Sequence, residues 1–222
     1  MTTASATARK LARRIDPRPR YNYTVSRAHG FVYYRVAKVA TRSISAWLRE
    51  LDPEPVYLTG RPAPFDPLHR LFRFGFVRNP WDRLVSCWLD KVIGPTDYWR
   101  DTPLKGLPFD AFVHQIATWD LDTCDRHVRR QAALLPPKGL DFIGRFEHLD
   151  ADVARVADRL GLPASGLPRR NTSSDRQSYH AYYTPELADL VGRLYAVDAS
   201  RFGYTFDGIA TEGGETDSTR GA

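Results

Sequence analysis

Phe31-Val-Tyr-Tyr-Arg-Val-Ala-Lys38-Val-Ala-Thr41-Arg42-Ser43 is the stretch that decides the fold, because an apolar run gives way there to a helical stripe. The apolar run predicts a strand over 30–37, and a helix is predicted over 43–51 after a loop at 38–42. The first N–H groups of a helix lack partners within it and lie at the positive end of its dipole. The junction therefore predicts a site that binds an anion.

The same design recurs in Phe72-Arg-Phe-Gly-Phe-Val77-Arg78-Asn79-Pro80. A strand is predicted over 72–77 and a helix from Pro80 to about residue 92, with Asn79 as N-cap and proline at the first helical position. Arg78 ends the strand, and its planar guanidinium suits a phosphate group. Two such junctions in one chain indicate a ligand that carries two anionic groups.

The composition fits a single globular domain. The chain has 222 residues, of which 42% are hydrophobic and 12% aromatic, and its formal net charge is +6. We expect a disordered basic leader at 1–20, one domain at 21–207 and a disordered tail at 208–222. The positive charge favours an anionic partner without identifying it, since a nucleic-acid-binding protein and an enzyme for a phosphorylated cofactor look alike at this level.

Strands that alternate with helices predict an α/β protein with a central parallel sheet flanked by helices on both faces. Beyond the two junctions, the predicted elements are strands at 56–58 and 140–143 and helices at 109–117, 125–135, 149–160 and 185–197. The predicted loops, which we expect to shape the pocket of a second substrate, are 52–70, 94–108 and 163–183.

The loop that starts at Lys38 differs from an ATP-binding P-loop, since it lacks both glycines and the Gly-Lys-Ser/Thr ending. It offers one lysine and three hydrogen-bonding side chains where the helix begins, which suits a compact anion. Two simpler interpretations stay open from spacing alone. In one, the hydroxyl side chains of the loop only cap the helix. In the other, Arg78 lies at the surface and pairs with Asp82 or Asp90.

Both junctions resemble known motifs of one enzyme family. The loop from Lys38 to Ser43 is similar to the 5′-phosphosulfate-binding loop of sulfotransferases that use 3′-phosphoadenosine 5′-phosphosulfate (PAPS), although Ala37 stands where the family commonly has proline. Phe76-Val-Arg78-Asn-Pro-Trp-Asp-Arg-Leu-Val-Ser86 resembles their 3′-phosphate motif, an arginine followed eight residues later by a serine. The resemblance covers roughly residues 30–206. It is closer to the carbohydrate type, which includes chondroitin, dermatan, HNK-1 and heparan 2-O-sulfotransferases.

This resemblance implies a three-layer fold like that of P-loop NTPases and transfer of a sulfuryl group from PAPS to a hydroxyl, with PAP as the second product. The acceptor would be a small molecule or, more in keeping with the family, a saccharide. Lys38 would stabilise the leaving phosphate, and Arg78 with Ser86 would hold the 3′-phosphate. The implied 5′-phosphosulfate-binding residues are Lys38, Val39, Ala40, Thr41, Arg42 and Ser43. No metal is implied, and no cluster of metal ligands is apparent in the sequence.

The acceptor hydroxyl needs a base, for which the family uses a histidine or a carboxylate. His69, just before the second strand, and His127, in a His-x-x-x-Gln element that ends at Gln131, are the two candidates. Glu147 is better explained as an acid at a helix N-terminus than as a catalyst.

Three other functions are weighed against this one: a basic nucleic-acid-binding module, a kinase that uses ATP, and a relative that binds PAP without turnover. The positions of the basic residues argue against nucleic acid as a partner, and the missing glycines argue against ATP. No apolar segment reaches the length of a membrane span. We therefore expect a cytoplasmic protein of bacterial origin, and the sequence leaves its oligomeric state open.

Overall fold

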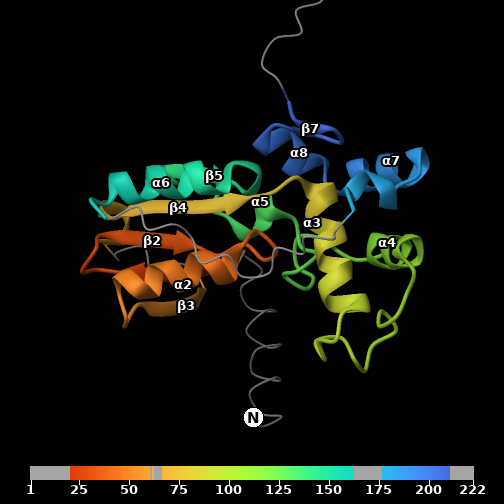
Figure 1. The fold of residues 1–222 in the computed structure, drawn as a ribbon, viewed down its shortest axis with the longest axis horizontal. Coiled ribbons are helices and arrows are strands. Elements are labelled where there is room, and N and C mark those ends of the chain that lie inside the picture. Colours follow the sequence, from red (N-terminus) through yellow and green to blue (C-terminus); the bar gives the residue numbers. More distant parts are fainter. Residues whose placement is uncertain (1–20, 61, 63–66, 163–176, 211–222) are drawn as a thin grey trace, which may run out of the picture.

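A five-stranded sheet forms one half of the molecule (Figure 1). The computed structural model describes residues 21–60, 62, 67–162 and 177–210, so the predicted leader and most of the predicted tail lie outside the described residues. The strand order is β3-β1-β2-β4-β5. Their bounds are β1 Tyr21–Ser26, β2 Phe31–Tyr34, β3 Val56–Gly60, β4 Phe72–Val77 and β5 Phe142–Arg145.

The sheet is mixed, so the prediction of a parallel sheet is correct only in part. β2, β4 and β5 run parallel, as expected for strands joined through helices. β1 pairs antiparallel with both β2 and β3. A tight turn, with Gly30 at φ 69°, joins β1 directly to β2, and a connection that short requires antiparallel strands. β1 itself was not predicted from the sequence.

Two helices flank the sheet and complete its core (Figure 1). α2 (Thr41–Leu51) follows β2 and buries Trp47, and α6 (Leu149–Arg159) follows β5 and buries Val156. These side chains join the buried aromatic residues of β2 and β4 in one hydrophobic cluster. The sheet is thereby held rigid, and the strand ends that carry Lys38 and Arg78 are fixed relative to each other.

A second hydrophobic cluster lies beyond the end of β4 toward which its arrow points (Figure 1). α3 (Pro80–Cys87), α4 (Phe109–Ala117) and α7 (Pro185–Leu194) contribute buried side chains to it, with Trp81 and Phe112 among the largest. The remaining elements are η1 (Pro67–Arg70), the π-helix η2 (Trp88–Ile93), α5 (Gln131–Leu134), η3 (Phe146–His148), η4 (Tyr179–Tyr182), α8 (Ala196–Phe202), β6 (Tyr204–Thr205) and β7 (Gly208–Ile209).

Three predicted helices differ from the structure. The helix predicted from Pro80 to 92 becomes a π-helix after Cys87. The helix predicted over 125–135 is wrong except for α5, because the Asp125 side chain accepts the backbone N–H of His127 and holds a turn there. The helix predicted over 185–197 ends at 194, and α8 begins after Tyr195.

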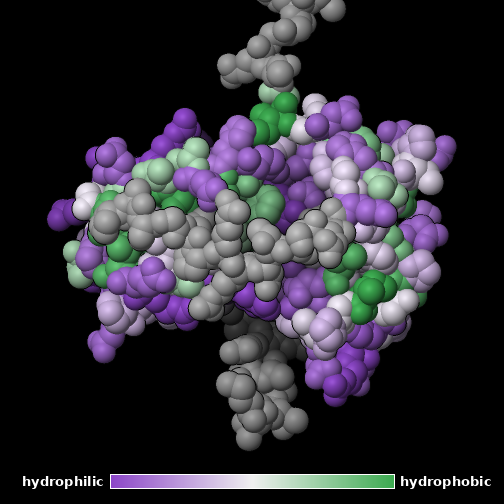
Figure 2. Space-filling view, in the orientation of Figure 1, coloured by the Kyte–Doolittle hydropathy of each residue, from purple (hydrophilic) through white to green (hydrophobic). Residues whose placement is uncertain are grey.

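The end of the chain and one surface also bear on the predictions. The predicted disordered tail begins too early, since β7 pairs with β6. On the face shown in Figure 2, hydrophobic residues form small separate patches among hydrophilic ones. Within the described ranges, none of the helices combines the length and the apolar character that a bilayer crossing needs.

Candidate active site

The parallel pairing of β2 with β4 brings the two junctions together. Tyr34 near the end of β2 lies opposite Gly75 near the end of β4, so Lys38 and Arg78 leave the sheet at the same edge. Nη1 of Arg78 donates a hydrogen bond to the carbonyl oxygen of Lys38, with 3.3 Å between the atoms. The two predicted anion-binding segments are therefore in direct contact.

The loop between β2 and α2 holds two residues in the left-handed region. Lys38 has φ 70° and Ala40 has φ 55°, although neither is glycine. Such a conformation costs about 1–3 kcal/mol per residue and is found where a site imposes it. The strained turn places the start of α2 beside the end of β2, which is what a loop that cradles an anion requires.

The start of α2 has no side-chain cap. Ala40 is the N-cap residue and cannot accept the first N–H groups of the helix. Thr41 and Ser43 already lie inside α2, and the Thr41 hydroxyl donates to the Val36 carbonyl. The simpler interpretation, in which these hydroxyls only cap the helix, is therefore wrong. Uncapped N–H groups next to a lysine form a suitable donor set for a phosphate or sulfate.

The side chains of the loop differ in exposure. Val39 and Ser43 are buried, Lys38 and Thr41 are half-buried, and Arg42 is exposed. Val39 contributes its backbone to the loop while its side chain joins the core beneath the sheet edge. Arg42 is the residue of this set that faces solvent, so it can reach a bound anion only from outside the loop.

The Lys38 ammonium is paired with a residue that was not among the predicted site residues. Nζ of Lys38 lies 2.7 Å from Oδ2 of Asp90, and the lysine side chain is 14% exposed. Burial lowers the pKa of Lys38 and outweighs the opposite effect of Asp90. Burial opposes ionisation of Asp90 as well, yet its contact with Lys38 keeps the pKa of that carboxyl below the ordinary value.

Arg78 is buried rather than at the surface. Its side chain is 6% exposed, and Nε and Nη2 lie 2.7 and 2.6 Å from Oδ2 of Asp82. The guanidinium also lies over the ring of Phe146, at 3.9 Å from the centroid. The pairing with Asp82 considered from the sequence is therefore present, but in a buried setting where the guanidinium is held in one orientation.

The backbone of Arg78 is fixed from the other side by Gln131. Its N–H donates to Oε1 of Gln131 at 3.0 Å, and its carbonyl accepts from Nε2 at 2.8 Å. The buried Asp198 in turn accepts the backbone N–H of Gln131 at 2.7 Å. The sequence marks Gln131 only as the end of the His-x-x-x-Gln element, and its role follows from this contact.

The N-cap prediction for Asn79 is confirmed. Its Oδ1 accepts the backbone N–H of Trp81 at 3.0 Å. Glu147 accepts the backbone N–H of Asn79 at 2.7 Å and the hydroxyl of Tyr204 at 2.8 Å. Glu147 therefore joins the end of β4 to the C-terminal segment, which is a structural role and not that of a base.

Ser86 lies on α3 two turns beyond Arg78 and is half-buried. Asp82 and Ser86 are four residues apart on one face of α3, whereas Arg78 precedes the helix and contacts it through its ion pair with Asp82. Asp90 lies beyond α3, in the π-helix η2, and contacts Lys38. Asp82 and Asp90 thus connect α3 and η2 to Arg78 and to the Lys38 loop.

His127 is buried and pairs with the half-buried Asp125. Nδ1 of His127 lies 2.8 Å from Oδ1 of Asp125, and the histidine side chain is 8% exposed. The hydroxyl of Tyr98 donates to the other oxygen of Asp125 at 2.7 Å. Burial lowers the pKa of His127, so the ring is neutral near pH 7. A proton on Nδ1 satisfies Asp125 and leaves Nε2 as an acceptor.

A continuous series of contacts links this dyad to Lys38. Nζ of Lys91 lies 3.3 Å from the same Asp90 oxygen that Lys38 contacts. The Lys91 ammonium lies over the ring of Tyr98, 5.0 Å from its centroid, and that ring contacts His127 at 4.5 Å between centroids. The structure therefore places His127 in the same cluster as the predicted leaving-group lysine.

His69 is not in this cluster. It lies in η1, just before β4 begins, whereas Arg78 follows the end of that strand. Six residues of strand span roughly 20 Å. His69 is exposed at the opposite edge of the sheet, so the structure does not support it as the base.

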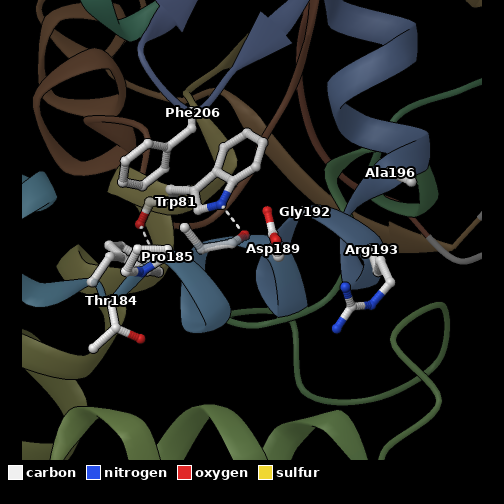
Figure 3. Close-up of a pocket in the computed structure, with 10 residues that line it drawn as sticks. Trp81, Thr184, Pro185, Asp189, Gly192, Arg193, Ala196 and Phe206 are labelled. Carbon is white, nitrogen blue, oxygen red and sulfur yellow. Dashed lines mark hydrogen bonds between the residues drawn. The ribbon is translucent and has the colours of Figure 1, made fainter.

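A cavity of about 660 Å³ lies along α7 and does not coincide with the predicted site (Figure 3). Trp81 and Phe206 line it, and the indole N–H of Trp81 is already bonded to the Ala188 carbonyl at 2.9 Å. None of the predicted donor-binding residues lines this cavity. Over the described part of the chain, no three His, Cys, Asp or Glu residues are placed to hold a metal ion.

Residues 21–205 match the sulfotransferase family, which is most of the chain. The chain belongs to the sulfotransferase family. This range includes both junctions and the His127 dyad. Membership disfavours the nucleic-acid-binding module and the ATP-dependent kinase as alternatives. It also agrees with the P-loop-like fold that the resemblance implied, although no solved structure matches this chain.

Curated relatives of this chain include proteins named carbohydrate sulfotransferases. Carbohydrate sulfotransferase 14 of Danio rerio is 27% identical over 235 aligned positions, which cover 85% of this chain and 63% of the relative. Its counterpart in Homo sapiens is 24% identical over 79% of this chain and 51% of the relative. An uncharacterized protein of Archaeoglobus fulgidus is 32% identical over 46% of this chain and 78% of the relative. The chain thus spans less than two thirds of the carbohydrate sulfotransferases it matches.

Proposed function

We propose that this sulfotransferase moves a sulfuryl group from PAPS to a hydroxyl of a carbohydrate acceptor and releases PAP. The contact between Arg78 and the Lys38 carbonyl carries the proposal, because it joins the two segments that resemble the 5′- and 3′-phosphate motifs. A nucleotide with anionic groups at both positions is the ligand that such a pair of junctions fits. The names of the curated relatives support a carbohydrate as acceptor.

The donor-binding roles follow from the chemistry of each group. The uncapped N–H groups at the start of α2 and the Lys38 ammonium would hold the 5′-phosphosulfate, while Arg78 and Ser86 would hold the 3′-phosphate. The donor supplies a sulfur atom whose bond to the phosphate oxygen is easily broken. Lys38 neutralises the charge that develops on that oxygen, and a fixed donor of this kind contributes about 2.7–4 kcal/mol to catalysis.

His127 is the base in this proposal. As the acceptor oxygen forms its bond to sulfur, its proton passes to Nε2 of His127, and the electron pair of the broken S–O bond stays on the leaving phosphate. Asp125 holds the proton on Nδ1 and stabilises the imidazolium that forms. The dyad is suited to this because burial keeps His127 neutral before the reaction.

Binding of PAP tests the donor assignment. PAP at millimolar concentration should raise the melting temperature, and ATP, which lacks a 3′-phosphate, should raise it much less. Arg78→Ala should abolish the shift caused by PAP. Arg100→Ala is a matched control, because Arg100 is exposed and pairs only at the surface with Asp97. No shift of the wild-type protein with PAP would refute the proposed donor.

A further inference from the structure

Asp90 and Lys91 are adjacent charged residues in the π-helix η2, and the proposed reaction gives them no role. One carboxylate oxygen of Asp90 contacts two ammonium groups, at 2.7 Å from Lys38 and 3.3 Å from Lys91. The Lys91 side chain is only 7% exposed. A carboxylate shared between the buried Lys91 and the half-buried candidate catalytic Lys38 is an arrangement that needs an explanation.

The π-helix is held in place at its C-terminal end. A Cβ atom at Gly94 would lie 2.7 Å from the Leu89 carbonyl oxygen, so only glycine fits there. The Thr96 hydroxyl donates to the Asp90 carbonyl at 3.0 Å, and Nζ of Lys105 donates to the carbonyls of Gly94 and Thr96. π-Helical turns occur frequently at functional sites. Here the turn sets the position of Asp90 against Lys38.

The charges at this point conflict with binding of an anion at Lys38. Asp90 places a negative charge in direct contact with the ammonium that the donor phosphate would use. Two anionic groups beside one ammonium repel each other strongly in a partly buried site. A carboxylate that lost its partner there would also be costly, because a buried charge requires compensation. Lys91 offers that compensation from the other side.

We propose that Asp90 is an exchangeable counter-ion of Lys38, which Lys91 retains when the phosphate of the donor takes over Lys38. The inference rests on the proposed function, since it assumes a donor phosphate at Lys38. In the absence of donor, Asp90 neutralises Lys38 and holds its side chain in place. With donor bound, the Asp90–Lys91 pair keeps the carboxylate compensated and away from the phosphate. Asp90 and Lys91 are positioning residues, because both act through Lys38.

A double-mutant cycle on PAP affinity, measured by calorimetry, tests the exchange. Asp90→Asn removes the competing charge and should tighten PAP binding about tenfold. Lys91→Met removes the alternative partner, leaves Asp90 to Lys38 alone and should weaken binding about tenfold. In the Asp90→Asn background, Lys91→Met should change the affinity by less than about twofold. This non-additivity is the signature of a residue that acts through Asp90.

Two control variants separate the exchange from simpler effects. Asp97→Asn makes the same change in net charge at an exposed position and should leave PAP affinity within about twofold of wild type. Lys91→Arg keeps a cation and should bind PAP nearly as wild type does, which identifies any loss in Lys91→Met as loss of charge. Melting temperatures without ligand show whether each variant is folded.

The possible failures are distinguishable. If Asp90→Asn weakens PAP binding, Asp90 does not compete with the donor for Lys38 and the exchange is wrong. If Lys91→Met weakens PAP binding equally with and without Asp90, Lys91 and Asp90 act independently and the exchange is also wrong. In both of those cases PAP still binds, so the proposed function survives. If wild-type protein does not bind PAP at all, the proposed function is wrong and the exchange is wrong with it.

Discussion

The Arg78 guanidinium donates to the backbone carbonyl of Lys38 and thereby joins the ends of two parallel strands. This contact makes the two junctions one unit, because Arg78 is also paired with Asp82 and lies over Phe146. A change that displaces Arg78 must therefore disturb the Lys38 loop as well. Binding at one phosphate site and catalysis at the other are expected to be coupled through this single side chain.

Gln131 should be essential for that unit. Gln131→Leu leaves the buried N–H and carbonyl of Arg78 without their partners, and we expect it to lower the free energy of unfolding by about 3 kcal/mol. It should also reduce the thermal shift caused by PAP. Urea unfolding measures the first effect. Gln115→Leu, at an exposed position on α4, should change stability by less than about 0.5 kcal/mol. Equal stability of the two variants would contradict the role of Gln131.

Lys38 should separate catalysis from donor binding. Lys38→Met keeps the length of the side chain but removes the positive charge that neutralises the leaving phosphate, so kcat should fall about 10²–10³-fold. The thermal shift with PAP should persist in part, since Arg78 and the start of α2 are unchanged. Sulfuryl transfer to a panel of carbohydrates measures kcat, and Lys138→Met at an exposed position serves as control. Full activity of Lys38→Met would rule out its role on the leaving group.

The sequence predicted the elements whose local pattern is strong. The strand at 72–77 and the helix at 109–117 have the predicted bounds, and Asn79 is the N-cap it was predicted to be. β1 was missed, and so was the antiparallel pairing that it brings to β2 and β3. Strand pairing depends on which segments meet in space, and the pattern within one strand does not contain that information.

The candidate site shows the same division. Lys38 and Arg78 were recognised because each ends an apolar strand, and the structure places them in contact. The sequence indicates Asp90 only as a surface partner of Arg78, because the predicted helix from Pro80 to 92 gives no sign of the π-helix that sets Asp90 against Lys38. His69 was misplaced because closeness in the chain does not say at which end of a strand a residue lies.

The pH dependence of transfer should identify His127 as the base. Since burial lowers its pKa, kcat/KM should stay constant as the pH falls through the ordinary value of about 6.5 and decline only below it. Asp125 opposes that lowering, so Asp125→Asn should move the decline to still lower pH and reduce kcat. A rate profile between about pH 4.5 and 8 measures both, with the exposed His114→Gln as control.

The same pKa has a consequence for stability. A histidine whose pKa is lowered by folding contributes stability that is fully present above the ordinary value of about 6.5 and is lost as the pH falls toward the lowered one. His127→Gln should therefore reduce the loss of stability in that acidic window while leaving the PAP-induced thermal shift intact.

For the rate profile, a decline of kcat/KM that begins above about pH 6.5, or one unchanged in Asp125→Asn, would exclude the neutral dyad.

Ala40, which lies in the left-handed region at the start of α2, is a position where glycine should raise the free energy of unfolding, whereas glycine within a helix usually lowers it. Ala40 has φ 55°, and glycine adopts this conformation without the steric cost that alanine bears, so Ala40→Gly should stabilise the protein by about 0.5–1 kcal/mol. Ala46→Gly, in the middle of the same helix, should destabilise it by about 1 kcal/mol or less. Urea unfolding of the two variants compares them directly. If both lower the free energy of unfolding, the strain assigned to the Lys38 loop is absent, and its shape must then be set by the contacts of Thr41 and Arg78 alone.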